Sequence, residues 1–129
     1  MADPASLQRI LYVEDDPDIQ AVARLALEAV GGFTVALCGS GREALETAEA
    51  FAPDLLILDV MMPELDGPAT LQALRRRPAL AGVPAIYMTA KTHPGDLARL
   101  RAQGAVDIIT KPFDPMRLPD QIREIWNRL

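Results

Sequence analysis

The hydrophobic positions of the chain follow two alternating patterns. Short runs of β-branched and large apolar residues predict buried strands, because runs this short, bounded by turn residues, are typical of a parallel sheet. Between and after them, apolar residues recur three and four positions apart, which predicts helices. The predicted strands cover residues 9–13, 33–38, 55–59, 85–89 and 106–110.

Capping residues mark several helix ends. Pro17 suits a first helical turn, and Gly31 with Gly32 ends that helix. Its apolar residues at helical spacing are Ile19, Val22, Ala23, Ala26, Leu27 and Val30. Ser40 and Glu43 form a capping box for a helix reaching Phe51. Further helices are predicted from Pro68 to Arg76 and from Pro94 to Gly104.

The last helix is predicted to begin near Leu118, since Pro119 cannot donate a helical hydrogen bond. Its apolar stripe should pack on the sheet and comprises Ile122, Ile125, Trp126 and Leu129. Five consecutive strand–helix units predict an α/β, doubly wound fold: a five-stranded parallel sheet of order 2-1-3-4-5 with helices on both faces. With 129 residues, 50% of them hydrophobic, the chain fits one globular domain.

Composition narrows the class of partner. A net charge of −5 and a pI of about 4.8 argue against a general nucleic-acid or membrane binder. The lone Cys38 has no disulfide partner, and no signal sequence or apolar run of ~20 residues is present. We therefore expect a cytoplasmic protein, a buried Cys38, and output through protein contact, because no DNA-binding helix-turn-helix fits after the last helix.

Polar residues follow four of the predicted strands. They are Glu14, Asp15 and Asp16 after the first, Asp59 at the end of the third, Thr89 after the fourth and Lys111 after the fifth. In a parallel sheet these strand ends share one edge, where crowded carboxylates repel one another unless a cation lies between them. Oxygen-rich sites with open water positions suit Mg²⁺, so we expect a divalent ion.

A metal-bound carboxylate beside an ammonium and a hydroxyl suits phosphoryl transfer, with Asp59 as the nucleophile. Each residue alone also has a structural interpretation. Asp59 could merely cap the turn that follows its strand, and Glu14 to Asp16 could complement a helix dipole. Thr89 could be a strand-favouring residue and Lys111 a surface charge. Four strand ends with one consistent chemistry favour the functional interpretation.

The motifs VEDD (13–16), LDVMMPELDG (58–67), MTA (88–90) and TKPF (110–113) together resemble the receiver domain of bacterial two-component response regulators. The resemblance covers nearly the whole chain. It implies a flavodoxin-like (βα)5 fold and a stand-alone receiver over residues 1–129, ordered from about residue 8, without an effector domain. It also implies a monomer or weak dimer.

The resemblance further implies that Asp59 accepts a phosphoryl group from a phosphohistidine of a sensor kinase or phosphotransfer protein. Asp15, Asp59 and the Met61 backbone carbonyl would ligate Mg²⁺ or Mn²⁺, with Glu14 acting through water. Thr89 and Lys111 would contact the phosphoryl group, across a cis Lys111–Pro112 bond. The protein would catalyse its own phosphorylation and slow dephosphorylation without being a turnover enzyme.

Two positions depart from this family's pattern. Ile108 stands where receivers usually carry a switch aromatic, so ring rotation cannot be the switch there, and Glu14 replaces the commoner Asp. Met61 and Lys91 occupy positions that tune phosphate lifetime in the family. A phosphate-independent interaction module or a phosphate sink of the same fold stays open. His93 is expected to be a solvated loop residue.

Overall fold

The sheet is parallel and has the strand order β2-β1-β3-β4-β5, which confirms the predicted topology. The computed structural model describes residues 6–129. The strands are β1 (Arg9–Val13), β2 (Thr34–Cys38), β3 (Leu55–Asp59), β4 (Ala85–Thr89) and β5 (Asp107–Thr110). The helices are α1 (Pro17–Arg24), α2 (Gly41–Phe51), α3 (Gly67–Arg75), α4 (Pro94–Ala102) and α5 (Leu118–Asn127), with a π-helical continuation η2 (Leu25–Val30) and a 3₁₀ turn η3 (Pro78–Leu80).

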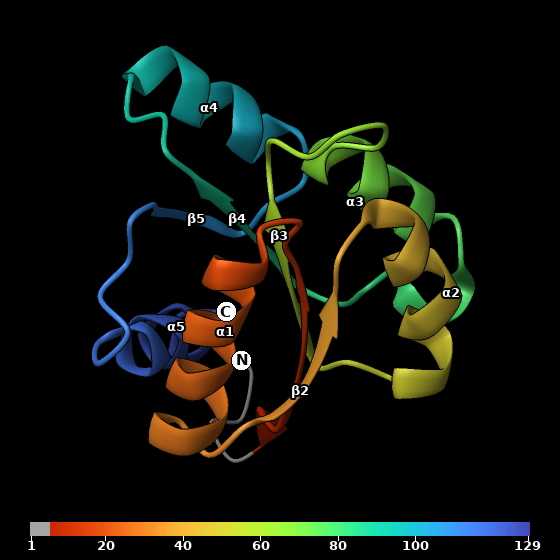
Figure 1. The fold of residues 1–129 in the computed structure, drawn as a ribbon. Coiled ribbons are helices and arrows are strands. Elements are labelled where there is room, and N and C mark those ends of the chain that lie inside the picture. The colour runs from red at the N-terminus through yellow and green to blue at the C-terminus, as the bar shows by residue number, and fades with distance from the viewer. Residues whose placement is uncertain (1–5) are drawn as a thin grey trace.

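Helices cover both faces of the sheet, and each face has its own core (Figure 1). Alternate strand residues such as Tyr12 and Ile57 pack against α1, η2 and α5. Their neighbours, such as Leu58 and Tyr87, pack against α2, α3 and α4. Every residue of β3 is buried, so its apolar run is the centre of both cores. Within residues 6–129, no helix has the length and apolar character needed to cross a membrane.

The α1 segment differs from its prediction. The helix continues with π-helical geometry over Leu25–Val30. Ala23, Ala26 and Leu27 of the predicted stripe are fully buried. Val22 and Val30, which share this helical spacing, are exposed, at 41% and 43%, so the spacing alone does not place a residue in the core.

The other local predictions are confirmed apart from details. Strand β2 begins at Thr34 and β5 at Asp107, one residue later than predicted, and α3 lies one residue earlier. Ser40 caps α2 by accepting from Glu43 N, but the Glu43 carboxylate accepts from Gly39 N instead of Ser40 N, which differs from the expected box.

The C-terminal helix and Cys38 behave as predicted. Helix α5 begins at Leu118, and three residues of its apolar stripe are buried, while Leu129 packs at the edge of the core. Cys38 is buried at the end of β2, and this burial raises the pKa of its thiol to about 11. The thiol is therefore neutral at neutral pH.

Candidate functional site

A cavity of about 230 Å³ lies at the carboxyl ends of β1, β3, β4 and β5. The sheet order makes β1 and β3 neighbours, so the residues that follow them converge. The lining residues are Glu14, Asp15, Asp16, Ile19, Asp59, Met61, Thr89, Ala90 and Lys111. The structure thus brings all six strand-end residues singled out from the sequence into one cavity.

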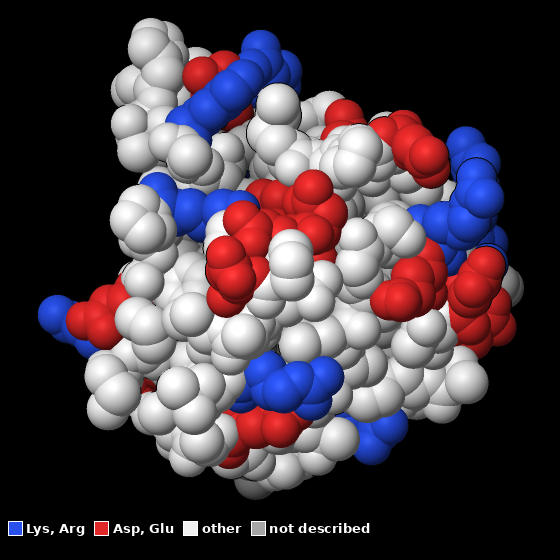
Figure 2. Space-filling view, viewed as in Figure 1, with Lys and Arg blue, Asp and Glu red and all other residues white. Residues whose placement is uncertain are grey.

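Three carboxylates form the acidic part of this cavity. Glu14, Asp15 and Asp59 each offer an oxygen, and these atoms lie within 4.8 Å of one another. Glu14 and Asp59 are buried and Asp15 is exposed, so the cluster opens toward solvent on one side. Figure 2 shows acidic side chains gathered on this face, with basic side chains beside them. An all-oxygen donor set with one open side fits a hard divalent cation such as Mg²⁺.

Lys111 bridges the two buried carboxylates. Its Nζ donates to Glu14 Oε1 at 2.9 Å and to Asp59 Oδ1 at 3.0 Å. The Lys111–Pro112 peptide bond is cis. Burial alone would lower the pKa of Lys111, but the hydrogen bonds and charges of the two carboxylates outweigh it and raise this pKa overall. The side chain therefore remains a cation beside Asp59.

Burial governs the electrostatics of Glu14. It raises the pKa of the Glu14 carboxyl, and the nearby Asp59 charge adds to this effect, although the hydrogen bond from Lys111 opposes it. Keeping two carboxylates together here therefore costs free energy, which a bound cation would offset.

Thr89 and Met61 complete the rim. Thr89 is buried, and its Oγ1 accepts a hydrogen bond from Lys91 N at 3.1 Å. Met61 follows β3 and its side chain is 67% exposed. The cavity therefore has a hydroxyl on one wall and a flexible apolar side chain at its mouth.

Asp59 is not a helix cap. The cap of α3 is Asp66, whose Oδ1 accepts from Ala69 N at 2.9 Å. Glycine is needed at position 67, the first residue of α3, because a Cβ there would lie 2.5 Å from the backbone oxygen of Asp59. The Asp59 carboxylate accepts instead from Lys111, and among the described residues no backbone N–H of the following turn donates to it, so the turn-cap interpretation is wrong.

The structural alternative holds for part of the first acidic cluster. Asp16 caps α1 by accepting from Asp18 N at 2.8 Å and Ile19 N at 3.4 Å. Glu14 and Asp15 do not share this role and belong to the carboxylate cluster. His93 is exposed before α4, as expected, and also caps that helix by accepting from Gly95 N at 3.1 Å.

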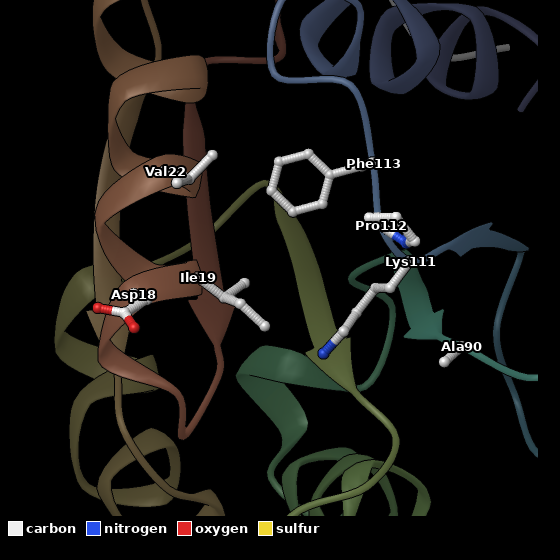
Figure 3. A pocket seen from close by; sticks show the side chains of 7 residues that line it. All are labelled: Asp18, Ile19, Val22, Ala90, Lys111, Pro112 and Phe113. Carbon is white, nitrogen blue, oxygen red and sulfur yellow. The ribbon is translucent and has the colours of Figure 1, made fainter.

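An apolar groove of about 460 Å³ adjoins the cavity, and the sequence pattern did not predict it. Figure 3 shows the groove between α1 and the segment after β5, with the Phe113 ring facing Val22 and the Lys111 side chain pointing away from Pro112. The lining residues are Asp18, Ile19, Val22, Ala90, Lys111, Pro112 and Phe113. Because helical spacing does not distinguish a core position from a groove position, only the place of Val22 beside a TKPF-type loop could have signalled this surface.

A family model for the response regulator receiver domain matches residues 10–123. The chain belongs to this receiver domain family. The receiver is similar to the DNA-binding response regulator MtrA of Mycolicibacterium smegmatis, at 38% identity over 116 residues, which are 90% of this chain and 49% of MtrA. The chain spans about half the length of the curated relatives it matches.

Solved structures agree with this assignment. The Vibrio cholerae chemotaxis protein CheY4 matches the receiver with a TM-score of 0.85 at 28% identity, covering 93% of this chain and 99% of CheY4. The receiver domain of the sensor histidine kinase PA1611 from Pseudomonas aeruginosa PAO1 matches with a TM-score of 0.82 at 32% identity, covering 95% of this chain and 98% of the PA1611 receiver chain. That structure has a magnesium ion coordinated in its active site cleft.

Proposed function

We propose that this receiver is a phosphoacceptor of a two-component phosphorelay and that Asp59 is the residue phosphorylated. The observation that carries the proposal is the position of Asp59: a buried carboxylate in a solvent-accessible cavity, 3.0 Å from the Lys111 ammonium and beside two further carboxylates. A structural ion pair would not need the additional, repelling carboxylates. A site that takes up a cation and a phosphoryl group does.

In the proposed reaction, an Asp59 carboxylate oxygen attacks the phosphorus of a phosphohistidine. The new O–P bond forms as the N–P bond breaks, and the imidazole nitrogen keeps the electron pair of that bond. Before transfer Lys111 would pair with the Asp59 carboxylate, and after transfer it would pair with the phosphoryl oxygens, which then carry the negative charge. The Thr89 hydroxyl would donate a hydrogen bond to one of these oxygens. No general base is required, since the carboxylate is already a nucleophile at neutral pH.

The residues that would hold Mg²⁺, or Mn²⁺ in its place, are Asp15, Asp59 and the Met61 backbone carbonyl, with Glu14 acting through water. When bound, the ion supplies positive charge that neutralises carboxylates and phosphoryl oxygens together. Glu14 also acts on the lysine, because its hydrogen bond keeps the Lys111 ammonium at the cavity when Asp59 changes charge. Met61, which lines the cavity, and Lys91, two residues after Thr89, are proposed to set the lifetime of the phosphorylated state.

The donor is proposed to be a protein that docks over the apolar groove. Ile19, Ala90 and Lys111 line both the groove and the cavity, so a partner covering one reaches the other. Val22 is the exposed apolar side chain on the α1 wall. Val22→Asp should slow transfer from a phosphohistidine protein while leaving phosphorylation by a small donor unchanged, because only the protein must desolvate the groove.

Output is proposed to pass through protein contact, since the net charge of −5 disfavours direct binding to nucleic acid. Phosphorylation would draw Thr89 toward the phosphoryl group and shift the surface formed by α4, β5 and α5. A cytoplasmic location is proposed because Cys38 is a buried free thiol, which suits a reducing compartment.

The test is incubation with acetyl phosphate and Mg²⁺, followed by intact-mass measurement. We expect wild type to gain the mass of one phosphoryl group, and EDTA to abolish the gain. An Asp59→Asn variant should gain nothing. An unmodified wild type that also fails to bind Mg²⁺ would favour the phosphate-independent interaction module, and a phosphorylated wild type with an unchanged α4–β5–α5 surface would favour the phosphate sink.

A further inference from the structure

Tyr87 connects the middle of the sheet to the end of α4. Its ring is fully buried in β4, among the residues that pack under α2, α3 and α4. Its hydroxyl donates a hydrogen bond of 2.8 Å to the backbone carbonyl of Gln103, the residue that immediately follows α4. Carbonyls at a helix C-terminus have no partner within the helix, so this bond satisfies one of them.

Helix α4 has few other attachments. Leu100 is its one buried residue, and the helix lies beside β4 and β5 at the periphery of the fold (Figure 1). A second polar contact, between Arg101 and Asp107 of β5, measures 2.9 Å and lies at the surface, where such pairs contribute little. The Tyr87 bond, whose donor residue is fully buried, is therefore the better-shielded polar contact between the sheet and the C-terminal end of α4.

The same strand reaches the candidate site. Thr89 is two residues beyond Tyr87, so both side chains lie on one face of β4. Residues 90–93 then lead directly into α4 at Pro94. Both ends of α4 are therefore connected to β4. The chain itself connects β4 to the N-terminal end at Pro94, and the Tyr87 hydrogen bond connects β4 to the C-terminal end at Gln103. Ile108, which pairs with Tyr87 in the neighbouring strand, has no polar side-chain atom and cannot make an equivalent contact.

We propose that the Tyr87 hydroxyl couples the state of the Asp59 site to the C-terminal end of α4. A displacement of Thr89 toward a bound phosphoryl group shifts β4, and the hydroxyl transmits this shift to Gln103 and the following loop. Without the hydroxyl, the end of α4 no longer follows β4, while the site itself is unchanged. The inference rests on the proposed function, because it requires the site to bind a phosphoryl group.

The test uses amide NMR spectra of the full chain, with Mg²⁺ and with beryllofluoride as a phosphoryl analogue. Three variants are compared with wild type. Tyr87→Phe removes the hydroxyl and keeps the ring. Tyr12→Phe is the matched control, because the Tyr12 hydroxyl is also buried but has no hydrogen-bond partner among the described residues. Arg101→Gln removes the surface ion pair and controls for a general loosening of α4.

We expect the analogue to shift the amides of residues 103–106 in wild type, Tyr12→Phe and Arg101→Gln. In Tyr87→Phe these shifts should be lost, while shifts around Asp59 and Thr89 keep their full size. Full shifts at 103–106 in Tyr87→Phe, or their loss in Arg101→Gln as well, would overturn the coupling. A wild type that responds at Asp59 but not at 103–106 would do the same.

A second measurement needs no variant. Hydrogen exchange of amides 103–106 in wild type should change when the analogue binds, and an unchanged rate would contradict the proposal. If wild type shows no response around Asp59, the proposed function itself fails. The two failures are therefore distinguishable.

Discussion

Replacing Lys111 with methionine removes the ammonium and keeps an apolar side chain of similar shape. The two carboxylates it contacts, at 2.9 and 3.0 Å, have side chains only 1% and 5% exposed. Removing one partner from a buried ion pair costs about 3–5 kcal/mol, because a charge is left uncompensated. Lys111 is itself 17% exposed and Glu14 can take up a proton, so we expect the lower end, about 3 kcal/mol.

This loss converts to a large change in thermal stability. With an unfolding entropy of about 2.1 cal/mol/K per residue, a chain of 129 residues should lose about 11 °C in Tm. The assay is thermal unfolding by circular dichroism at neutral pH in EDTA. Lys91→Met is the matched control, because Lys91 is the other lysine of the chain and is exposed; we expect it to change stability by less than about 0.5 kcal/mol.

The pH dependence has a definite sign. The pKa of Glu14 is raised in the folded protein, so stability is highest where this carboxyl is protonated and is lost as the pH rises through its folded value. Without Lys111 this dependence should steepen, and the deficit of Lys111→Met should shrink as the pH falls. Equal Tm values for Lys111→Met and Lys91→Met would refute the electrostatic reasoning.

Three further changes test other parts of the structure. Glu14→Gln should raise the Tm in EDTA, because burial disfavours the Glu14 charge, and should weaken Mg²⁺ binding measured by titration. Gly67→Ala should cost about 1–3 kcal/mol in chemical denaturation, because its Cβ would meet Asp59 O, whereas Gly82→Ala, with open space around it, should not. Tyr87→Phe should lower the free energy of unfolding by about 1 kcal/mol, because the hydrogen bond to Gln103 is lost. Burial raises the pKa of Tyr87 to about 12, so the Tyr87 contribution to stability should be lost as the pH rises from 10 to 12, in wild type but not in Tyr87→Phe.

The strands could be predicted because short apolar runs bounded by turn residues mark them, whereas their order was the natural choice among the common arrangements of five βα units and the structure confirms it. Leu55 to Leu58 are buried as predicted, and α5 begins where Pro119 requires. The exposure of Val22 could not be predicted, because a valine at helical spacing fits either a core or a groove. The π-helical geometry of Leu25–Val30 could not be predicted either, because its apolar residues have the same spacing as those of a regular helix.

The candidate site was predictable as a set of residues but not as a geometry. Strand ends placed the carboxylates, Thr89 and Lys111 at one edge, because parallel strands share that edge. The bridging position of Lys111 between Glu14 and Asp59 depends on side-chain conformations that the sequence does not specify. The Tyr87 contact joins residues on different elements, so only the structure reveals it.

Chemical trapping decides whether Asp59 carries the phosphoryl group. After incubation with acetyl phosphate and Mg²⁺, borohydride reduces an aspartyl phosphate to homoserine, which peptide mass spectrometry assigns to a position. We expect homoserine at position 59 and at no other aspartate. Homoserine at Asp15 or Asp16, or a phosphorylated protein without homoserine, would show that the phosphoryl group is held elsewhere.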